Sequence, residues 1–298
     1  MPKVLILSDK RPGHENQSIA YAKLNNLDYN ICYVSFKNKF LKLLSYILDF
    51  LSIYIKIFDH TKIDKNSYDF IVSTGSITYY ANKYFAKKFN AKNIALMLPK
   101  GFKKNFYHIF ATLNDTEEKL PNLTLLPINL NYLNQTNYYK PNKKAIGFII
   151  GGDNSTFKMD EKIIGHINDI INKFPDHEVL ITTSPRTPKN IENLLKKQNY
   201  NFSVFYSENK INPIYDFTHY CEWVFLTQDS ISMISESVCN GNANIGILKL
   251  KKIANNEKFD KFLDILKDKN LVIVYDKNSS FKQTKKLDLK EILKDISL

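Results

Sequence analysis

Short apolar runs alternate with amphipathic stretches along this chain, and many of the runs end in small polar residues. A short continuous apolar run is typical of a strand buried on both faces of a sheet, whereas apolar residues three and four apart are typical of a helix. We predict strands at residues 3–7, 29–36, 68–73, 92–97, 107–111, 145–150, 178–182, 202–206, 223–226, 244–248 and 271–275, and helices at 17–24, 77–89, 160–174, 189–198 and 230–240. Strands alternating with helices predict parallel sheets with right-handed crossovers, and therefore an α/β fold.

The alternation breaks at residues 130–144, a polar and aromatic stretch without periodicity. We interpret this stretch as a linker between a Rossmann-like domain at 1–140 and a second one at 141–298, since a chain of 298 residues is long enough for two domains. Ligands of such sheets bind beyond the carboxyl ends of the strands. We therefore expect two parallel sheets that face a central cleft.

Composition and charge narrow the class of protein. Hydrophobic residues make up 44% of the chain, which excludes a disordered protein. Residues 1–140 hold 19 basic and 10 acidic side chains, so most of the net charge of +12 lies in the first half. A basic half attracts a phosphorylated substrate or an anionic membrane, although a lysine-rich solvated surface is the alternative. No zinc finger or RNA-recognition motif is present, so we do not expect nucleic acid as a partner.

The first candidate site follows the first predicted strand, in the sequence RPGHENQ at residues 11–17. Gly13 allows a tight turn, after which His14 and Glu15 begin a helix. His14 is suited to act as a general base, and Glu15 either orients the imidazole or acts as the base itself. A capped, solvated helix start is the alternative. The other acceptor-side candidates of this half are Arg11, Gly13, Asn16, Gln17 and, after the third strand, Gly75.

Two loops of the second half carry candidate phosphate ligands. The sequence GGDNST at 151–156 places a glycine pair where backbone N–H groups can approach an anion, although many turns need such a pair. The sequence TTSPRTP at 182–188 holds Arg186, one of only two arginines in the chain, between two prolines, where it can clamp a phosphate. The candidate donor-binding residues of these loops are Gly151, Gly152, Asn154, Ser155, Thr156, Ser184 and Arg186.

A third segment, TQDSISMISES at 227–237, ends a strand and begins a helix. The exposed N–H groups of a helix start attract phosphate. Glu236 lies one turn beyond Ser232 on the same side, where its carboxylate can accept hydrogen bonds from two ribose hydroxyls. An ordinary capped helix is the alternative. The candidate donor-binding residues of this segment are Gln228, Asp229, Ser230, Ser232, Met233 and Glu236.

Metal and cofactor sites are not expected. The chain has no DxD triplet, no CxxC pair and no cluster of histidine and cysteine with metal-ligand spacing. Its three cysteines are widely spaced, which argues against a disulfide framework. Neither the Walker A pattern nor GxGxxG occurs, so a P-loop and a dinucleotide fingerprint are excluded.

Residues 40–58 are strongly apolar, but Lys42, Asp49 and Lys56 interrupt them. Charges at this spacing make a membrane-spanning helix unfavourable. Two interpretations stay open at this stage. The segment is either a helix of the protein core or an interfacial helix whose lysines lie near anionic lipid.

Together, the motifs resemble those of the family named for the plant mitochondrial fission protein ELM1. The resemblance rests on RPGHENQ (11–17), GGDNSTF (151–157), TTSPRTP (182–188) and residues 212–236, in this order along the chain. Bacterial members of that family are assigned as glycosyltransferases of lipopolysaccharide or related surface glycans. The resemblance implies a two-domain fold of the GT-B type, with a nucleotide-sugar donor held mainly by the C-terminal half and an acceptor hydroxyl activated near His14.

We therefore predict a cytoplasmic, metal-independent glycosyltransferase of cell-surface glycan assembly, of lipopolysaccharide type, which inverts the anomeric carbon. Its expected partners are a nucleotide-sugar donor, a glycan or lipid-linked acceptor and an anionic membrane surface at the inner face of the membrane. Two alternatives stay open. One is a GT-B-like epimerase or hydrolase of nucleotide sugars, and the other is a non-catalytic, membrane-associated interaction protein.

Overall fold

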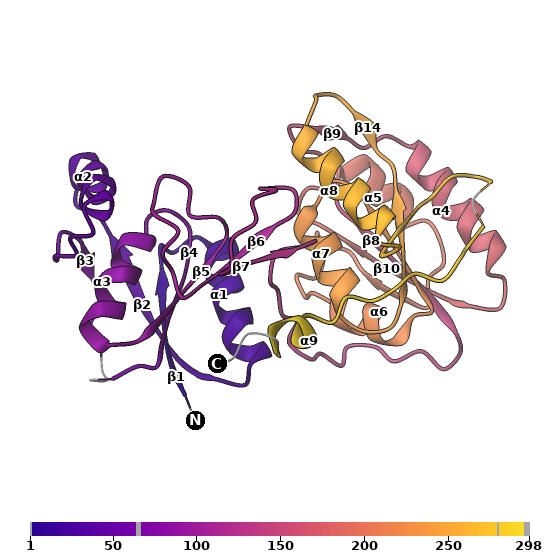
Figure 1. Cartoon of the computed structure of the whole chain (residues 1–298). Coiled ribbons are helices and arrows are strands. Elements are labelled where there is room, and N and C mark those ends of the chain that lie inside the picture. The colour runs from indigo at the N-terminus through magenta and orange to yellow at the C-terminus, as the bar shows by residue number, and fades with distance from the viewer. Residues whose placement is uncertain (1, 64–66, 279, 295–298) are drawn as a thin grey trace. The chain divides into compact units, whose positions relative to one another are not determined.

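The computed structural model describes residues 2–63, 67–278 and 280–294 (Figure 1). The chain forms two compact units. The first unit comprises the residues up to Tyr132 together with the C-terminal segment from Leu289, and the second unit comprises Leu133–Asp288. The division thus lies within the predicted linker at 130–144, but the C-terminal segment groups with the first unit and not with the second.

The first unit is an α/β sheet structure in which helices follow three of the strands. Its elements are β1 (Lys3–Ser8), α1 (Pro12–Leu24), β2 (Asp28–Ser35), α2 (Lys39–Phe50), β3 (Asp59–His60), β4 (Phe70–Thr74), α3 (Tyr79–Phe89), β5 (Lys92–Leu96), β6 (His108–Thr112), β7 (Leu123–Leu126) and α9 (Leu289–Lys294). The helix α9 contacts α1 and buries Leu289 and Leu293. These contacts are the physical reason why the C-terminal segment belongs to this unit.

The sheet of the first unit has the order β3-β2-β1-β4-β5-β6-β7. All neighbours are parallel except β3, which pairs antiparallel with β2. The chain moves from β1 to β2 in one direction and from β4 to β5 in the other. Because such crossovers are right-handed, α1 and α3 lie on opposite faces of the sheet. The point where the direction reverses lies between β1 and β4.

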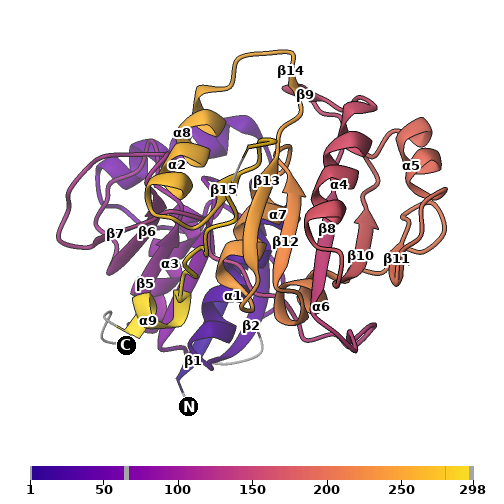
Figure 2. The same cartoon turned by 90° about the vertical axis from the view of Figure 1, so that its right-hand side faces the viewer.

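The second unit repeats this plan. Its elements are β8 (Ala145–Ile150), β9 (Phe157–Lys158), α4 (Lys162–Lys173), β10 (Glu178–Thr183), α5 (Lys189–Leu195), β11 (Phe202–Val204), α6 (Ile214–Tyr220), β12 (Trp223–Thr227), α7 (Ile231–Cys239), β13 (Asn244–Leu248), β14 (Lys251–Lys252), α8 (Glu257–Asp268) and β15 (Ile273–Val274). The main sheet is parallel in the order β11-β10-β8-β12-β13-β15. Figure 2 shows β10, β8, β12 and β13 side by side.

The core strands β8, β10 and β12 are buried along their whole length, as expected for strands covered on both faces. The direction in which the chain adds strands to the sheet reverses between β8 and β12, as it does between β1 and β4 in the first unit. Each unit therefore has one such switch point at the carboxyl edge of its sheet. In open α/β sheets, these switch points are where ligands bind.

The segment at 40–58 does not form the core helix that was one of its two predicted structures. The helix α2 ends at Phe50, and the chain beyond it takes up a positive φ of 60° at Ser52 and continues without regular structure. The interpretation as a core helix is wrong, because Phe40 is 70% exposed and Phe50 is 73% exposed. No helix among the described residues is both long and apolar enough to cross a bilayer.

Candidate functional site

The candidate residues of the second unit lie around its switch point. The pair Gly151–Gly152 follows β8, Gln228 and Asp229 follow β12, and the loop at 184–188 follows β10. Because these three strands are neighbours in the order β10-β8-β12, their loops lie together at one edge of the sheet. The sequence prediction that these motifs share one site is therefore consistent with their placement.

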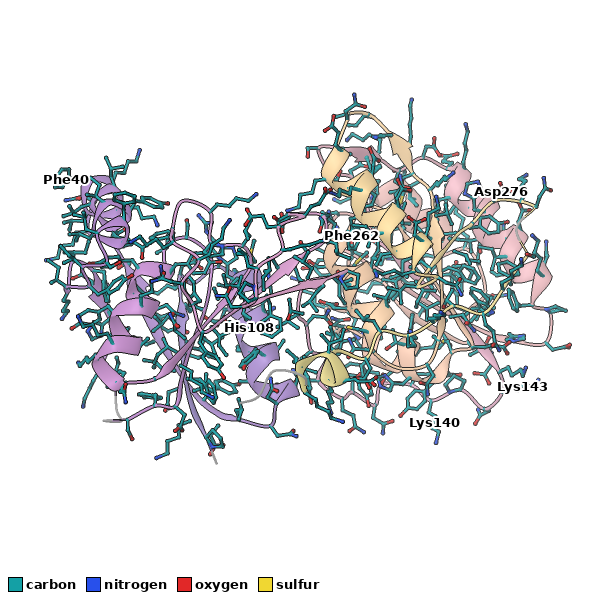
Figure 3. The ribbon with its side chains drawn as sticks, viewed as in Figure 1. Phe40, His108, Lys140, Lys143, Phe262 and Asp276 are labelled. Atoms are coloured by element: carbon teal, nitrogen blue, oxygen red, sulfur yellow. The ribbon has the colours of Figure 1, made fainter. Side chains whose placement is uncertain are left out.

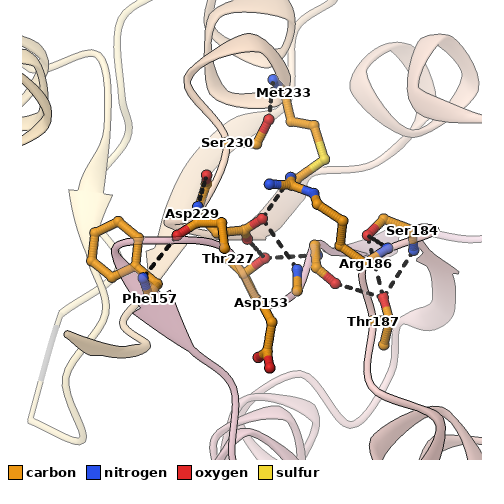
Figure 4. Close-up of polar contacts among 12 residues, drawn as sticks. Asp153, Phe157, Ser184, Arg186, Thr187, Thr227, Asp229, Ser230 and Met233 are labelled. Atoms are coloured by element: carbon orange, nitrogen blue, oxygen red, sulfur yellow. Dashed lines mark hydrogen bonds and ion pairs between the residues drawn. The ribbon is translucent and has the colours of Figure 1, made fainter. Parts of the chain in front are cut away.

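Asp229 joins the three loops (Figure 4). Its side chain is 0% exposed, and its Oδ2 accepts hydrogen bonds from Arg186 Nη2 at 2.7 Å and from the Gly152 amide at 3.1 Å. Its Oδ1 accepts from the Thr227 hydroxyl at 2.6 Å. Burial raises the pKa of Asp229, and the bonds from Thr227 and Gly152 and the charge of Arg186 oppose that rise. With no exposed surface, the Asp229 side chain holds its neighbours in position, and its predicted contact with the donor stays a prediction.

The two glycines after β8 are required by close packing. A Cβ atom on Gly151 would lie 2.1 Å from Asp229 Oδ1, and one on Gly152 would lie 1.9 Å from the Arg186 carbonyl oxygen. Their amides already donate to Thr227 Oγ1, at 2.7 Å, and to Asp229. The glycine pair thus brings the loops into contact, and its predicted contact with an anion stays a prediction.

Hydrogen bonds of Asn154 hold the rest of the GGDNST motif in place. Asn154 Nδ2 donates to the Asp229 carbonyl oxygen at 2.9 Å, and Asn154 Oδ1 accepts from the amides of Thr156 and Phe157 at 2.7 Å and 2.8 Å. Thr156 is buried and Ser155 is exposed. Asn154 therefore acts as a turn residue in this structure, and only Ser155 offers its side chain freely to solvent.

The loop that carries Arg186 is held by hydrogen bonds of its own residues and to the loop after β8. The Thr187 hydroxyl donates to the Gly151 carbonyl oxygen at 2.5 Å and accepts from the Ser184 amide at 3.0 Å, and the Arg186 amide donates to Ser184 Oγ at 3.2 Å. The Arg186 side chain is 39% exposed. Because a guanidinium has five N–H donors, the bond from Nη2 to Asp229 leaves others for a ligand. Arg186 is thus anchored at one nitrogen and still available to an anion.

Helix α7 begins at this same edge. Ser230 is its N-cap, and Ser230 Oγ accepts from the Met233 amide at 3.4 Å. Gln228 is buried and its Nε2 donates to the Leu250 carbonyl oxygen at 3.3 Å, whereas Ser232 is exposed in the first turn. The first turn of the helix therefore presents Ser232 and backbone N–H groups, which is the arrangement that binds phosphate at helix starts.

A pocket of about 250 Å³ opens beside this helix. Three predicted residues, Ser184, Met233 and Glu236, line it together with Pro185. Burial raises the pKa of Glu236 to about 7 from its ordinary value of 4.5. The structure thus brings the predicted carboxylate into a concave, partly apolar site, where it titrates near neutrality.

Sequence reasoning missed part of this pocket. Tyr206, Lys210 and Asn212 line it from the segment between β11 and α6. The Tyr206 amide donates to Thr183 Oγ1 at 2.8 Å, and Lys210 Nζ lies 5.8 Å from the centre of the Tyr206 ring. The available signal was the position of this segment after a strand, but the predicted strand at 202–206 includes Tyr206, whereas β11 ends at Val204.

The candidate residues of the first unit also lie at a switch point. His14 Nδ1 lies 3.0 Å from Oδ2 and 3.2 Å from Oδ1 of Asp9, whose side chain is 1% exposed. A carboxylate only accepts, so Nδ1 carries the proton and Nε2 is left as the basic nitrogen. Gly75 has a φ of +91°, and a Cβ there would lie 2.5 Å from His14 Nδ1. The loop after β4 therefore needs glycine to make room for the imidazole.

The carboxylate that contacts His14 is Asp9 and not Glu15. Glu15 Oε2 accepts from the Ser8 hydroxyl at 2.5 Å instead, so the idea that Glu15 orients the imidazole does not fit this structure. The remaining acceptor-side candidates are Arg11, which is the N-cap of α1, and Gly13, Asn16 and Gln17 in the first turns of this helix. Arg11 Nε lies 3.7 Å from Asp9 Oδ2, and Gln17 Nε2 donates to the Gly13 carbonyl oxygen at 3.1 Å.

Known glycosyltransferases share the fold. The glycosyltransferase SnogD from Streptomyces nogalater is 9% identical with a TM-score of 0.51, and the match covers 99% of this chain and 94% of SnogD. The glycotransferase of kitacinnamycin is also 9% identical with a TM-score of 0.51, and the match covers 94% of this chain and 88% of that chain. At this identity the likeness concerns the fold alone, which is α/β of the GT-B type.

Sequence comparisons give the family. An uncharacterized protein of Rickettsia prowazekii (strain Madrid E), RP120, is 26% identical over 289 residues, which cover 80% of this chain and 81% of the relative. Residues 12–293 match the family described as Mitochondrial fission ELM1, and this range includes the four motifs on which the resemblance rested, except for Arg11 at the start of the first. The chain therefore belongs to the mitochondrial fission ELM1 family.

Proposed function

We propose that this protein is a glycosyltransferase that takes its sugar from a nucleotide-sugar donor bound in the second unit. The observation that carries the proposal is the pocket beside α7, which the half-buried carboxylate of Glu236 lines. The start of α7 and the partly exposed Arg186 do not line this pocket, but they lie at the same edge of the sheet. A carboxylate, a cation and free N–H groups are the groups that a ribose and a pyrophosphate require.

Each part of the donor has a matching group. The ribose hydroxyls would donate to Glu236, and the base would lie against Pro185 and Tyr206 in the same pocket. The pyrophosphate would accept from the first turn of α7, including Ser232, and from the guanidinium of Arg186. Asp229 supports this arrangement because it holds Arg186. Two phosphate charges would thus be offset by fixed protein groups, and we expect turnover without added divalent cation.

His14 in the first unit is the proposed general base. Asp9 holds the proton on Nδ1, so Nε2 would take the proton from an acceptor hydroxyl as that oxygen attacks the anomeric carbon. The C1–oxygen bond to the nucleotide breaks as the new bond forms, and the nucleoside diphosphate leaves with the electron pair. An in-line attack of this kind inverts the anomeric carbon. The proposed acceptor is a cell-surface glycan of lipopolysaccharide type, in keeping with the excess of basic residues in the first half of the chain.

A thermal-shift screen with UDP, GDP and CMP tests the donor site. We expect one of them to raise the melting temperature of the intact protein, and inorganic phosphate at the same concentration to have a smaller effect. Glu236→Gln should abolish the difference between the nucleotides and phosphate. Glu208→Gln, at a side chain that is 62% exposed in the same unit, is the matched control. If all three nucleotides fail to shift the wild type, the proposal is wrong.

Turnover distinguishes a transferase from its closest rival. A nucleotide sugar identified in the screen is incubated with the protein, with and without an extract of surface glycans. Transferase activity predicts release of the nucleotide that depends on the extract. Release at the same rate without the extract would instead identify a hydrolase, and conversion of the sugar without release would identify an epimerase.

A further inference from the structure

The outer surface of α2 and the segment after it is apolar. Seven large side chains are between 44% and 73% exposed here, and we call them the apolar ridge: Phe40, Leu43, Ile47, Phe50, Leu51, Ile53 and Ile55. The first four recur every three or four residues, so they lie on one face of α2. Figure 3 labels Phe40, which projects away from the ribbon of the first unit. Single exposed apolar residues are common, but a contiguous group of this size marks an interaction surface.

Polar contacts on the inner side of α2 determine which face is exposed. Asp49 is 1% exposed, and its carboxylate accepts from Lys83 Nζ at 2.7 Å and from the Lys103 amide at 2.7 Å. Lys42 on the same side donates to the Ser76 carbonyl oxygen. Asp49 and Lys42 thus face the protein beside the inward-packed Tyr46 and Leu48, and the exposed face of α2 is left mainly to apolar side chains.

The segment after α2 is held in place as well. The Tyr80 hydroxyl shares its one proton between the carbonyl oxygens of Ile53 and Ile55, at 3.1 Å and 3.2 Å, and accepts from the amide of Ile55 at 3.1 Å. Tyr54 packs inward against the core of the unit. These bonds hold the backbone at Ile53 and Ile55, so that the two side chains extend the ridge. Their side chains are therefore exposed on an ordered segment and not on a frayed helix end.

The exposed charged residues of the segment that carries the ridge, residues 36–58, are lysines. Asp49 is the only acidic residue within 36–58, and it is buried. Lys37, Lys39 and Lys56 are exposed in the same range. Lys103 Nζ lies 5.5 Å from the centre of the Phe50 ring and donates to Ser52 Oγ at 2.9 Å. The surface is thus an apolar strip with a rim of lysines, and the next acidic residue, Asp59, lies in β3.

We propose that the apolar ridge docks on a lipid bilayer with anionic headgroups, with α2 lying in the plane of the interface. A helix of 12 residues is about 18 Å long, which is too short to span the hydrocarbon but suited to the boundary of headgroups and acyl chains. The ridge would enter the acyl region while the lysines meet lipid phosphates. This inference does not depend on the proposed function.

Two other occupants fit the surface less well. A second copy placed ridge to ridge would bring the two lysine rims together, and like charges would repel. A protein partner would be expected to meet aromatic and arginine anchors, since Trp, Tyr and Arg carry most binding energy at protein interfaces. The ridge has none of these three residues.

Vesicle co-sedimentation of the full-length protein tests the proposal. The probes are vesicles of phosphatidylcholine with phosphatidylglycerol, and vesicles of phosphatidylcholine alone. We expect binding to the anionic vesicles that falls steeply with salt, because lysine–phosphate attraction is screened. Ile47→Asp should weaken this binding by about 10-fold to 100-fold, since it removes an inserted side chain and adds a charge of the wrong sign. Ile253→Asp, at a side chain 49% exposed in the second unit, is the matched control and should bind as the wild type does.

Circular dichroism and the melting temperature confirm that both variants fold. No binding to anionic vesicles would overturn the proposal, as would equal binding by Ile47→Asp and the wild type. Equal binding to both kinds of vesicle would remove the role of the lysines. Sedimentation velocity without lipid tests whether a second copy of the chain covers the ridge. A wild-type dimer that becomes a monomer in Ile47→Asp would assign the ridge to a second copy and overturn the proposal.

Discussion

Glu236 should make the second unit less stable as it ionises. The carboxyl lines the pocket beside α7, and burial raises its pKa from 4.5 to about 7. A group whose pKa is raised by folding stabilises the folded state fully below its unfolded pKa, and this contribution is lost as the pH rises through the folded pKa. The stability of the wild type should therefore fall between about pH 4.5 and pH 7 because of this one group.

The size of the effect follows from the shift. Each unit of pKa corresponds to about 1.4 kcal/mol, so ionised Glu236 destabilises the folded state by about 3 kcal/mol at pH values above 7. Glutamine has the shape of the neutral carboxyl group and does not ionise. For a domain of this size, about 1 kcal/mol shifts the melting temperature by roughly 2–4 °C. Glu236→Gln should therefore melt about 6–12 °C higher than the wild type near pH 8.

Calorimetric melting of both proteins from about pH 4 to pH 8 measures the difference. The two melting temperatures should agree at the acidic end and separate through neutrality. Glu222→Gln is a control of opposite sign, because Lys144 and His177 lower the pKa of Glu222, and this variant should lose stability at high pH. The reasoning would be refuted if Glu236→Gln melted higher than the wild type by the same amount at every pH. It would also be refuted if the wild type melted higher than the variant near pH 8. The same variant should bind nucleotide more weakly, so the group that costs stability is one that the proposed donor site needs.

Three further predictions concern the proposed base, the phosphate clamp and the buried ion pair. His14→Ala should lower turnover about 10²–10⁴-fold and leave nucleotide affinity nearly intact. Asp9→Asn should also lower turnover, because an amide does not fix the proton on Nδ1. Lost nucleotide affinity in either variant would mean that the loop after β1 binds the donor. Arg186→Ala should weaken nucleotide binding by about 10-fold to 100-fold, since hydrogen bonds to charged groups contribute about 1.5–3 kcal/mol, and unchanged affinity by calorimetry would remove Arg186 from the site. Lys83→Met should destabilise the protein by about 3–5 kcal/mol, because the Asp49 carboxylate stays buried without its partner; urea denaturation measures this, and equal stability would contradict it.

The sequence predicts the central strands well, because their signal is the burial itself. β8 and β12 are continuous apolar runs, and a run of that kind has few other interpretations. The helix α8 is absent from the predicted set, although Asn256 caps it by accepting a hydrogen bond from the Phe259 amide and its apolar residues recur at helical spacing. For α2, the apolar pattern predicts a helix but not its partner, since the same residues suit a core and an exposed surface.

The candidate site shows a similar limit. Chain position after a strand predicts that the loops at 151–156, 184–188 and 228–230 lie together, because parallel strands share one carboxyl edge. It does not predict which carboxylate faces His14, since Asp9 and Glu15 are both near it in sequence and only side-chain direction separates them. The role of Asp229 was equally hidden, because an acidic residue at a helix start has the same sequence signal whether it is exposed or completely buried.

The return of the chain to the first unit at Leu289 has a consequence for how such a gene can be recombined. The second unit is one continuous stretch, Leu133–Asp288, and the first unit is encoded in two pieces on either side of it. A single crossover within the linker would exchange the second unit only together with α9, and the buried Leu289 and Leu293 would then have to fit a foreign α1. Exchange of the second unit alone requires two breakpoints, so a replacement unit has to be inserted between the two pieces of the first unit and cannot be fused to one end of it.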